Sequence, residues 1–336
     1  MSSTDDTHEP GGLERLCLGA ALDREPGPGE VCLSVQAIGI DRAEKPFDNG
    51  MRGYKAVYPS RIEYDVVGVV EAVGAGVERL RVGHRVAAIP PSLLGGRGVY
   101  ADLAVFPVEA VLPWPEVLDA KQAAGLWTPW LTAWGGLVQQ GSLRRDDVVL
   151  LTAPNRSAGI AAIQIVKAAG ATAIAVIRSP VNQDELEDAG ADHVVATAID
   201  DLEEQVLAIT DGRGADLAFD GVGGPQLDSV AGAMTHGGRI VLYGHLDDSY
   251  TQMPIIAMMT KALTLRAHSI LHTTANPAAL AAAVDAIVRG VEQGKYRPIV
   301  DRTFRLSEIV EAHRYLDSIW CLGKVVVVPG VVGASG

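Results

Sequence analysis

The amino-acid sequence predicts an α/β protein with two parts, a β-rich, barrel-like part and a doubly wound parallel sheet. Three observations predict this fold class. From about Glu30 to Pro113, short β-type runs are broken by glycine and proline, as in small barrels. From about Asp146 to Ile270, apolar strand-like runs alternate with helical periodicity, which is typical of a parallel sheet covered by helices. In the last part of the chain, the pattern of the first part returns. Both ends of the chain are therefore expected to form the barrel-like part.

The predicted elements of the first part are four strands. They are short, rich in β-branched residues and bounded by turn signals. They cover residues 31–38, 66–73, 85–89 and 99–106.

The middle part is predicted to contain six strands with helices between them. Asp200, followed three positions later by Glu203, is a capping-box-like start for one of these helices. The strands are expected at 148–153, 173–177, 193–196, 216–220, 239–243 and 263–267, and the helices at 159–169, 184–189 and 200–209. In the last part we expect a helix at 277–293, an extended segment at 297–305, a helix at 307–316 and a strand at 323–328.

Composition and charge narrow the class of protein. The 336 residues are 48% hydrophobic and 21% charged, which is ordinary for a globular chain large enough for two cores. The formal net charge of −13 repels nucleic acid and anionic lipid, so we expect neither as a partner. The sequence contains no apolar run of the roughly 18 residues that a membrane-spanning helix needs.

The N-terminal segment is acidic and polar, unlike a signal peptide, and residues 1–12 are expected to be disordered. The three cysteines, Cys17, Cys32 and Cys321, are far apart and odd in number. This argues against a disulfide framework and against a cysteine-based structural zinc site. A cytoplasmic protein is therefore expected.

A tight turn connects the first strand of the middle part to a helix. Unpaired N–H groups and the positive end of the helix dipole suit a pyrophosphate at such a position. The usual fingerprint has three glycines here, and only one is present, so the turn alone is equally compatible with an ordinary strand–helix connection. The six alternating strands around it favour a nucleotide site. Its predicted residues are Asn155, Arg156, Ser157, Ala158 and Gly159.

The second strand of the middle part ends in Arg178 and Ser179, without a carboxylate. This is where a dinucleotide-binding sheet places the residue that contacts the ribose. An acidic residue there would bind the 2′-hydroxyl of NAD, whereas a guanidinium suits a phosphate. The sequence therefore favours NADP(H), with a solvated surface arginine as the alternative.

Several segments resemble the medium-chain dehydrogenase/reductase superfamily, most closely its zinc-independent quinone oxidoreductase and enoyl reductase branch. They occur in collinear order over nearly the whole chain from about residue 30. They are Thr132-Ala133, 150–170, 190–193, 220–224, 237–244, 312–315 and Gly323-Lys324. The resemblance implies a GroES-like β-barrel catalytic domain at 13–125 and 272–336, a Rossmann NADP(H)-binding domain at 126–271, and a homodimer. The apolar stretch 254–259 could serve the dimer contact or cover its own sheet.

The positions of the zinc ligands differ from those of relatives with catalytic zinc. Those relatives carry a cysteine where this chain has Asp41, and a glycine-histidine-glutamate triplet where it has Glu63, Tyr64 and Asp65. The four-cysteine lobe is also missing. Two carboxylates without a histidine make a poor zinc site, so no metal is expected. Without a Lewis acid, a conjugated carbonyl is easier to reduce than a plain ketone, because hydrogen-bond donors suffice to stabilise an enolate. The resemblance thus implies NADPH-dependent reduction of an activated C=C bond in an enone, enoyl thioester or quinone.

Tyr54 and Asp41 are the candidate catalytic residues. In the enoyl reductase relatives, a tyrosine on the corresponding loop donates a proton, and a phenol can also hydrogen-bond an enolate oxygen. Tyr58 and water are alternative donors, and a tyrosine that packs on the barrel is the structural alternative. Asp41 could orient the nicotinamide carboxamide, although its charge would oppose an enolate, which favours a structural role.

The remaining predicted cofactor contacts come from the resemblance and from strand ends. Each has a structural alternative: a packing residue, a loop cap or a surface charge. These contacts are Thr132, Gly221, Val222, Gly244, His245, Ser269 and Lys324. His268 and His272 are open to the same two interpretations. The tryptophans of 126–134 either contact an aromatic substrate or pack at a domain interface, and packing is favoured for each.

A second hypothesis is a non-redox member of the fold, such as a cyclase, a lyase or a binding protein. It is supported by the missing glycines around Arg156 and by Asp41. A ketone reductase or alcohol dehydrogenase is disfavoured, because it requires the metal.

Overall fold

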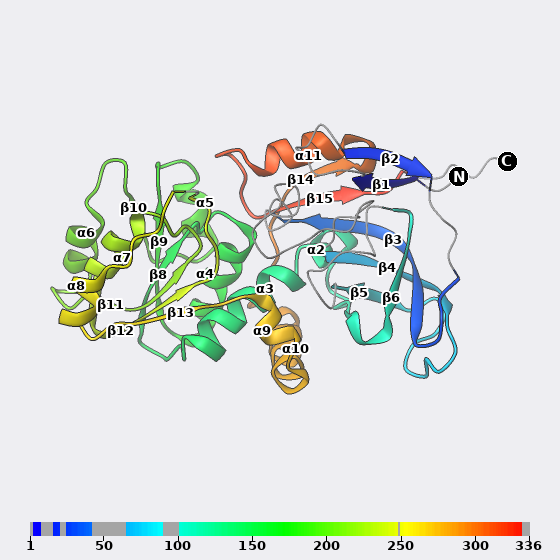
Figure 1. Ribbon diagram of the computed structural model, residues 1–336, viewed down its shortest axis with the longest axis horizontal. Coiled ribbons are helices and arrows are strands. Elements are labelled where there is room, and N and C mark those ends of the chain that lie inside the picture. The colour runs from blue at the N-terminus through cyan, green and yellow to red at the C-terminus, as the bar shows by residue number, and fades with distance from the viewer. Residues whose placement is uncertain are drawn as a thin grey trace. The chain divides into compact units, whose positions relative to one another are not determined.

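The computed structural model describes residues 3–7, 16–20, 25–41, 65–89, 101–247 and 249–330, with the backbone alone at 3–7 and 16–20. The chain divides into two units (Figure 1). Unit 1 consists of Met1–Thr128 and Pro298–Gly336, and unit 2 of Pro129–Arg297. Within the described ranges, no helix combines the length and the apolar character required to cross a membrane.

The N-terminal segment differs from its prediction. Strand β1 (Ser3–Thr7) pairs antiparallel with β2 (Leu16–Ala20), whereas the sequence predicts a disordered tail through residue 12. The backbone hydrogen bonds to β2 supply the order that the polar composition of this tail does not suggest.

Unit 1 is built around the long strand β3 (Glu30–Ile40), which pairs antiparallel with three other strands. The sheet order is β14-β15-β3-β4-β5-β7, and β6 also pairs with β3. Its other strands are β4 (Asp65–Val73), β5 (Arg85–Ala88), β6 (Leu103–Pro107), β7 (Val111–Pro113), β14 (Val300–Arg305) and β15 (Lys324–Val328). Its helical segments are η3 (Val108–Ala110), α2 (Ala120–Ala124), η5 (Leu306–Glu308) and α11 (Ile309–Leu316).

The buried face of α11 shares one apolar core with the strands of unit 1. The predicted barrel strands are confirmed within one or two residues, except the fourth. That strand begins at Leu103 rather than at 99, and residues 99 and 100 lie outside the described part.

Unit 2 contains a six-stranded, entirely parallel sheet in the order β10-β9-β8-β11-β12-β13. Numbered within the unit, this is 3-2-1-4-5-6, the dinucleotide-binding order. The strands are β8 (Val148–Thr152), β9 (Thr172–Ile177), β10 (His193–Ala196), β11 (Ala215–Asp220), β12 (Met234–Leu242) and β13 (Thr264–Ala267). All six predicted strands are therefore confirmed.

The helices of unit 2 follow the predicted alternation. They are α3 (Trp127–Trp134, beginning at the unit boundary), η4 (Gly135–Gln140, π-helical), α4 (Ser157–Ala169), α5 (Gln183–Asp188), α6 (Leu202–Ile209), α7 (Gln226–Gly232), α8 (Ile255–Thr260), α9 (Ile270–Thr274) and α10 (Pro277–Glu292). The predicted cap of α6 is displaced by one residue. Asp201, not Asp200, accepts a hydrogen bond from the Glu204 N–H at 2.9 Å.

Helix α10 belongs to unit 2, whereas the sequence analysis assigned residues from 272 onward to the barrel domain. The Gln139 side chain donates a hydrogen bond to the Ala279 carbonyl at 3.1 Å. The Tyr296 ring lies over Gly290 and 6.5 Å from the Trp130 ring. These contacts hold residues 277–296 against the segment that follows Pro129, which moves the second boundary to 297/298.

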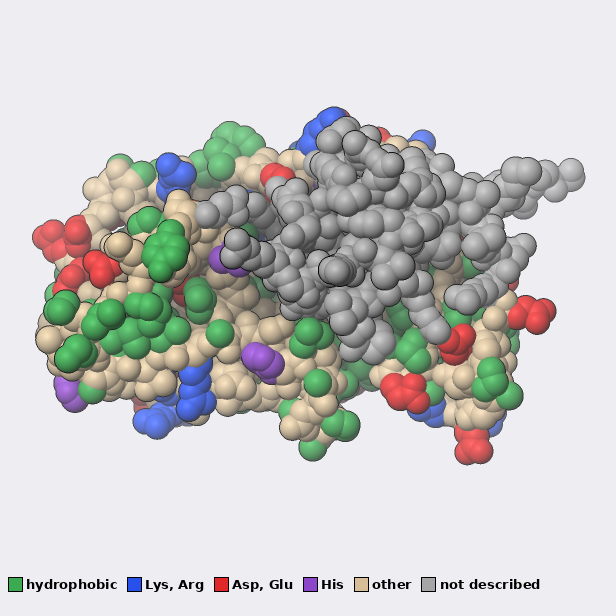
Figure 2. Space-filling view, viewed as in Figure 1, with side chains coloured by type: hydrophobic (Ala, Val, Ile, Leu, Met, Phe, Trp, Pro, Cys, Tyr) green, Lys and Arg blue, Asp and Glu red, His purple; other side chains and the backbone are tan. Residues whose placement is uncertain are grey.

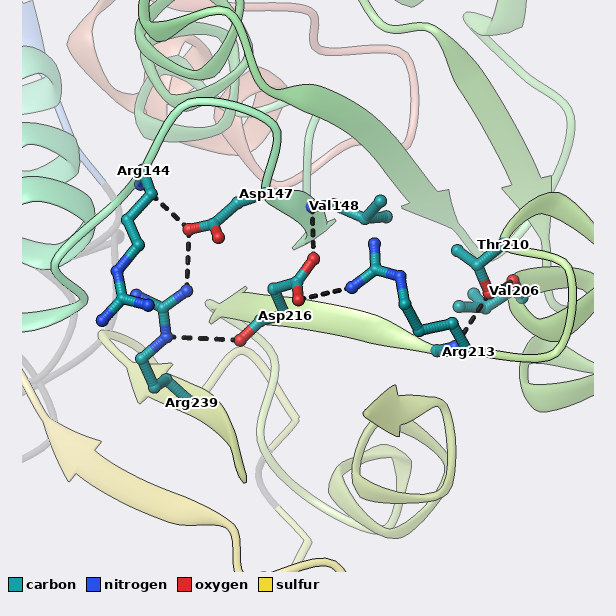
Figure 3. A network of polar contacts seen from close by, with 9 residues as sticks. Arg144, Asp147, Val148, Val206, Thr210, Arg213, Asp216 and Arg239 are labelled. Carbon is teal, nitrogen blue, oxygen red and sulfur yellow. Dashed lines mark hydrogen bonds and ion pairs between the residues drawn. The ribbon is translucent and has the colours of Figure 1, made fainter. Parts of the chain in front are cut away.

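A polar network joins the strands of unit 2 near their amino ends (Figure 3). Arg239 on β12 forms a 2.7 Å ion pair with Asp147 and donates a hydrogen bond to the Asp216 carbonyl at 3.4 Å. It also donates to the carbonyls of residues 141 and 142, both at 2.7 Å. Asp216 on β11 accepts a hydrogen bond from the Val148 N–H at 2.8 Å. Because ligands of such sheets bind at the carboxyl ends of the strands, this network stabilises the fold at the end opposite the candidate site.

Candidate active site

The carboxyl ends of β8 and β11, neighbours at the centre of the sheet, are joined by buried hydrogen bonds. Thr152 Oγ1 donates to Asp220 Oδ1 at 2.5 Å and accepts from the Gly221 N–H at 2.9 Å. Asp220 also accepts hydrogen bonds from the N–H groups of Val222 and Gly223, at 2.9 and 3.2 Å. The loop after β11 is thus fixed at the point where the strand order reverses, which is where nucleotides bind in these sheets.

The turn between β8 and α4 retains one glycine for a steric reason. A Cβ at Gly159 would lie 2.5 Å from the Ala153 carbonyl oxygen, so the helix packs on the strand only with glycine there. Arg156, by contrast, has φ −84° and ψ 161°, which any residue adopts. Its side chain does not cap α4. Arg156 therefore fits the turn without strain and adds a cation beside the helix N-terminus.

Tyr243, which follows β12, packs against the end of β11 and the loop after it. Its ring stacks on Phe219 with centroids 3.9 Å apart and planes at 11°. Its hydroxyl lies over Gly221, where a Cβ would come within 2.6 Å. Burial raises the pKa of Tyr243 above its usual value, Asp220 adds to this effect and Arg156 opposes it. The Tyr243 hydroxyl is consequently protonated at neutral pH and lies within electrostatic reach of Arg156.

The loops after β11 and β12 lie side by side. The Leu246 N–H donates to the Gly221 carbonyl, and the Asp247 N–H donates to the Val222 carbonyl, both at 3.1 Å. The structure thus brings together four predicted cofactor contacts at one end of the sheet. They are Gly221, Val222, Gly244 and the exposed His245.

Arg178 and Ser179 follow β9, with Arg178 exposed and Ser179 half-buried. A carboxylate that the sequence does not indicate, that of Asp247, lies near Arg178. The pKa of Asp247 is lowered, chiefly by hydrogen bonds from Ser249 and further by the charge of Arg178. Asp247 lies in the loop after β12, whereas Arg178 follows β9, so no local sequence pattern connects the two residues.

Two of the three tryptophans of α3 belong to the interior, and Trp134 is half-buried. Trp127 and Trp130 are almost fully buried, and Trp127 Nε1 donates to the Pro113 carbonyl at 3.0 Å. This favours the packing interpretation over a substrate contact. Thr132, on the same helix, is half-buried. Ser269 caps α9, where its hydroxyl accepts a hydrogen bond from the Leu271 N–H at 3.3 Å.

Unit 1 contains a buried cluster of one lysine and two aspartates. Lys324 Nζ donates to Asp65 Oδ2 at 2.9 Å and also pairs with Asp41. Asp65 Oδ1 accepts from the N–H and the hydroxyl of Thr128, at 2.9 and 2.7 Å. Burial opposes the charge of Lys324, but the two carboxylates outweigh it and raise its pKa above the usual value. Lys324 is therefore a permanent cation beside Asp41.

This cluster changes two sequence-based interpretations. Lys324 was predicted to contact the cofactor, yet its ammonium is buried against two carboxylates, which is at odds with that role. A structural role was favoured for Asp41 because its charge would oppose an enolate, and Lys324 supplies a compensating charge. In the part of the chain that is described, no three His, Cys, Asp or Glu side chains are arranged to hold a metal ion. Tyr54, Tyr58, Glu63 and Tyr64 lie outside the described residues.

Two family models match the chain, one in each unit. Residues 27–116 match the alcohol dehydrogenase GroES-like domain, and residues 158–289 match the zinc-binding dehydrogenase family. The chain belongs to the medium-chain dehydrogenase/reductase superfamily. The resemblance seen in the sequence is thereby confirmed, together with the GroES-like and Rossmann-type domains.

Two relatives are similar to this chain over almost the whole length of both proteins. A quinone oxidoreductase of Pseudomonas aeruginosa is 28% identical over 306 residues, which cover 91% of this chain and 93% of the relative. A 2-haloacrylate reductase of a Burkholderia species is 26% identical over 328 residues, covering 96% and 97%. A crystal structure of an NAD-dependent alcohol dehydrogenase has a TM-score of 0.90 and 28% identity, covering 98% of this chain and all of the other.

These relatives are oxidoreductases, and this chain is an oxidoreductase of the quinone oxidoreductase and enoyl reductase branch of the superfamily. The matched zinc-binding dehydrogenase segment lies in unit 2. Asp41 and Asp65 lie in unit 1.

Proposed function

We propose that this member of the superfamily is a zinc-independent oxidoreductase that uses NADPH to reduce an activated C=C bond in an enone, enoyl thioester or quinone. The observation that carries the proposal is the ammonium of Lys324 held between Asp41 and Asp65. By the sequence resemblance, these two aspartates stand at or beside the positions of zinc ligands. Because both carboxylates already neutralise an internal cation, they are poor ligands for a metal ion.

The residues at the carboxyl end of the unit 2 sheet fit a dinucleotide. The N-terminus of α4, with Gly159 closely packed behind it, suits the pyrophosphate, and Arg156 adds a positive charge. The Gly221–Val222 backbone, fixed by Asp220, can approach the bound molecule closely. Arg178, exposed after β9, suits a 2′-phosphate. NADPH, when bound, supplies the hydride.

The proposed roles in unit 1 concern the carbonyl of the substrate. Charge that develops on this oxygen needs hydrogen-bond donors. Tyr54 is proposed as the donor of the proton, with Tyr58 and water as alternatives. Asp41 is proposed to orient the nicotinamide carboxamide. Because Lys324 neutralises its charge, it would not repel the negative charge that develops on the enolate oxygen.

Titration calorimetry with NADPH and NADH tests the cofactor half of the proposal. We expect NADPH to bind more tightly than NADH, and Arg178→Gln to abolish the preference. Arg145→Gln is the matched control, because Arg145 is 82% exposed and lies before β8, away from the strand carboxyl ends. Consumption of NADPH by metal-free protein with enones, enoyl thioesters and quinones then tests the reaction.

A non-redox member of the fold is the second candidate. The Arg156 side chain, which stands where relatives have glycine, favours it if the guanidinium occupies the phosphate site. Folded protein that binds no nucleotide, and gains binding in Arg156→Gly, would establish this candidate and refute the first.

We also propose a homodimer. An apolar patch covers α8 and the segment before it (Figure 2), next to the edge strand β13. Its side chains are 50–86% exposed, and such patches commonly mark interfaces. They are Tyr250, Met253, Ile255, Ile256 and Met259.

A further inference from the structure

His268, directly after β13, is a buried imidazole with the backbone of Thr132 beside its ring. The residue is 5% exposed, and neither ring nitrogen has a hydrogen-bond partner in the described structure. Burial and the nearby His272 lower the pKa of His268 to about 4, so the ring is neutral at physiological pH. A buried polar group without a partner costs stability and often persists for a functional reason.

The ring occupies the space of a missing side chain on the neighbouring helix. A Cβ at Gly135 would lie 2.6 Å from His268 Cε1 and 2.8 Å from Nε2, as well as 2.4 Å from Thr273 Oγ1. Gly135 is the first residue of the π-helical segment η4, which continues α3. The backbone of Thr132, one turn earlier, also lies beside the ring. His268 thus contacts the helix where its α-helical part becomes π-helical, a distortion that is frequent at functional sites.

The next glycine of the helix approaches the sheet just as closely. A Cβ at Gly136 would lie 2.3 Å from Phe219, the residue on β11 that stacks on Tyr243. On the side of α9, Thr273 Oγ1 donates to Gln139 Oε1 at 2.9 Å. The helix is therefore held at three places by side chains from the carboxyl half of the sheet and from α9.

The position of this contact in the sheet relates it to one half of a dinucleotide. In the order 3-2-1-4-5-6, the two halves of a dinucleotide lie on opposite sides of the switch point between β8 and β11. Arg178, after β9, is on the adenosine side. His268, after β13, is on the opposite side, where the nicotinamide half would lie.

Resting on the proposed function, we infer that His268 is a positioning residue that sets the helix carrying Thr132 against the carboxyl end of β13, and thereby shapes the nicotinamide half of the cofactor site. Gly135 is its steric counterpart. The imidazole acts through the helix and does not touch the reacting atoms.

The test compares two ligands in two variants by calorimetry. His268→Leu keeps a buried side chain of similar size but removes the ring nitrogens, and His268→Gln restores an N–H donor. We expect His268→Leu to weaken NADPH binding about tenfold, because leucine cannot keep the polar contact of the ring with the Thr132 backbone, and His268→Gln to recover most of it. Adenosine 2′,5′-bisphosphate lacks the nicotinamide half and should bind equally to all three proteins. Thermal unfolding of each protein confirms that it is folded.

Equal weakening of both ligands would show a general structural effect and overturn the inference. So would unchanged NADPH affinity in His268→Leu. Absence of NADPH binding by the wild-type protein would instead overturn the proposed function, and the inference with it.

A second pair of variants tests the steric relation. Gly135→Ala alone should displace the ring and weaken NADPH binding. His268→Ala combined with Gly135→Ala removes the imidazole from the path of the new methyl group and leaves its contact with Thr273 Oγ1, so its NADPH affinity should exceed that of Gly135→Ala alone. Equal or lower affinity of the double variant would refute the pairing of these two residues.

Discussion

Lys324 Nζ lies 2.9 Å from Asp65 Oδ2, and each of these residues is only 1% exposed. Asp41 adds a second carboxylate to the same ammonium. Removing the cation of a buried ion pair leaves an uncompensated charge, which is more costly than the pair is stabilising.

Lys324→Met is therefore expected to lower the free energy of unfolding by about 3–5 kcal/mol at neutral pH. Lys121→Met, on the exposed side of α2, is the control and should change it by less than about 0.5 kcal/mol. Chemical denaturation measures both. A Lys324→Met protein as stable as the control would show that the cluster is not ionised as described.

Arg239→Met should destabilise unit 2 without affecting cofactor affinity, because its network lies at the amino ends of the strands (Figure 3). The change leaves the buried Asp147 and three carbonyls without this partner, at a cost of about 3 kcal/mol. Arg289→Met, which breaks an exposed pair on α10, should cost little. Weaker NADPH binding by a folded Arg239→Met protein would contradict this assignment.

Asp247→Asn should strengthen NADPH binding several-fold relative to NADH. Asp247 is half-buried and lies within the electrostatic reach of Arg178, so its charge opposes a phosphate at the same place. The gain should shrink as salt is added, because exposed charges are screened. Asp285→Asn, on the exposed surface of α10, is the control. An equal gain in affinity for NADPH and NADH would show that Asp247 does not act on the 2′-phosphate.

His268 should make unit 2 less stable in mild acid. Its pKa is about 4 in the folded protein and 6.5 in the unfolded chain, so between these pH values the unfolded state binds more protons. This contribution is complete above pH 6.5 and is lost as the pH falls toward 4, an effect of about 3 kcal/mol. His268→Gln should remove this part of the pH dependence, and the exposed His236→Gln should not. Identical pH profiles of wild type and His268→Gln would refute it.

Ile256→Lys should convert the proposed dimer into a monomer. Ile256 is 75% exposed at the centre of the α8 patch, and a lysine there would be buried without a partner in the interface. Sedimentation equilibrium measures the mass. Ile319→Lys, an exposed apolar residue of unit 1, should leave the mass unchanged. A monomeric wild-type protein would refute the proposal.

The sequence by itself determined the element types and the superfamily. The six strands of unit 2 were predictable because a strand buried on both faces is a continuous apolar run, such as that of β8, and the helices between them have their own periodicity. Gly159, Arg178 and the paired loop residues Gly221 and Gly244 were also identifiable, since each follows a strand at the expected end of the sheet.

Only the tertiary structure decided which distant groups meet. The Lys324–Asp65 pair, the Arg178–Asp247 approach and the His268–Gly135 contact join residues from separate elements. No local pattern encodes these distances. The assignment of α10 to unit 2 has the same origin. An amphipathic helix shows in its sequence which face is apolar, but the surface that covers this face is set by long-range packing.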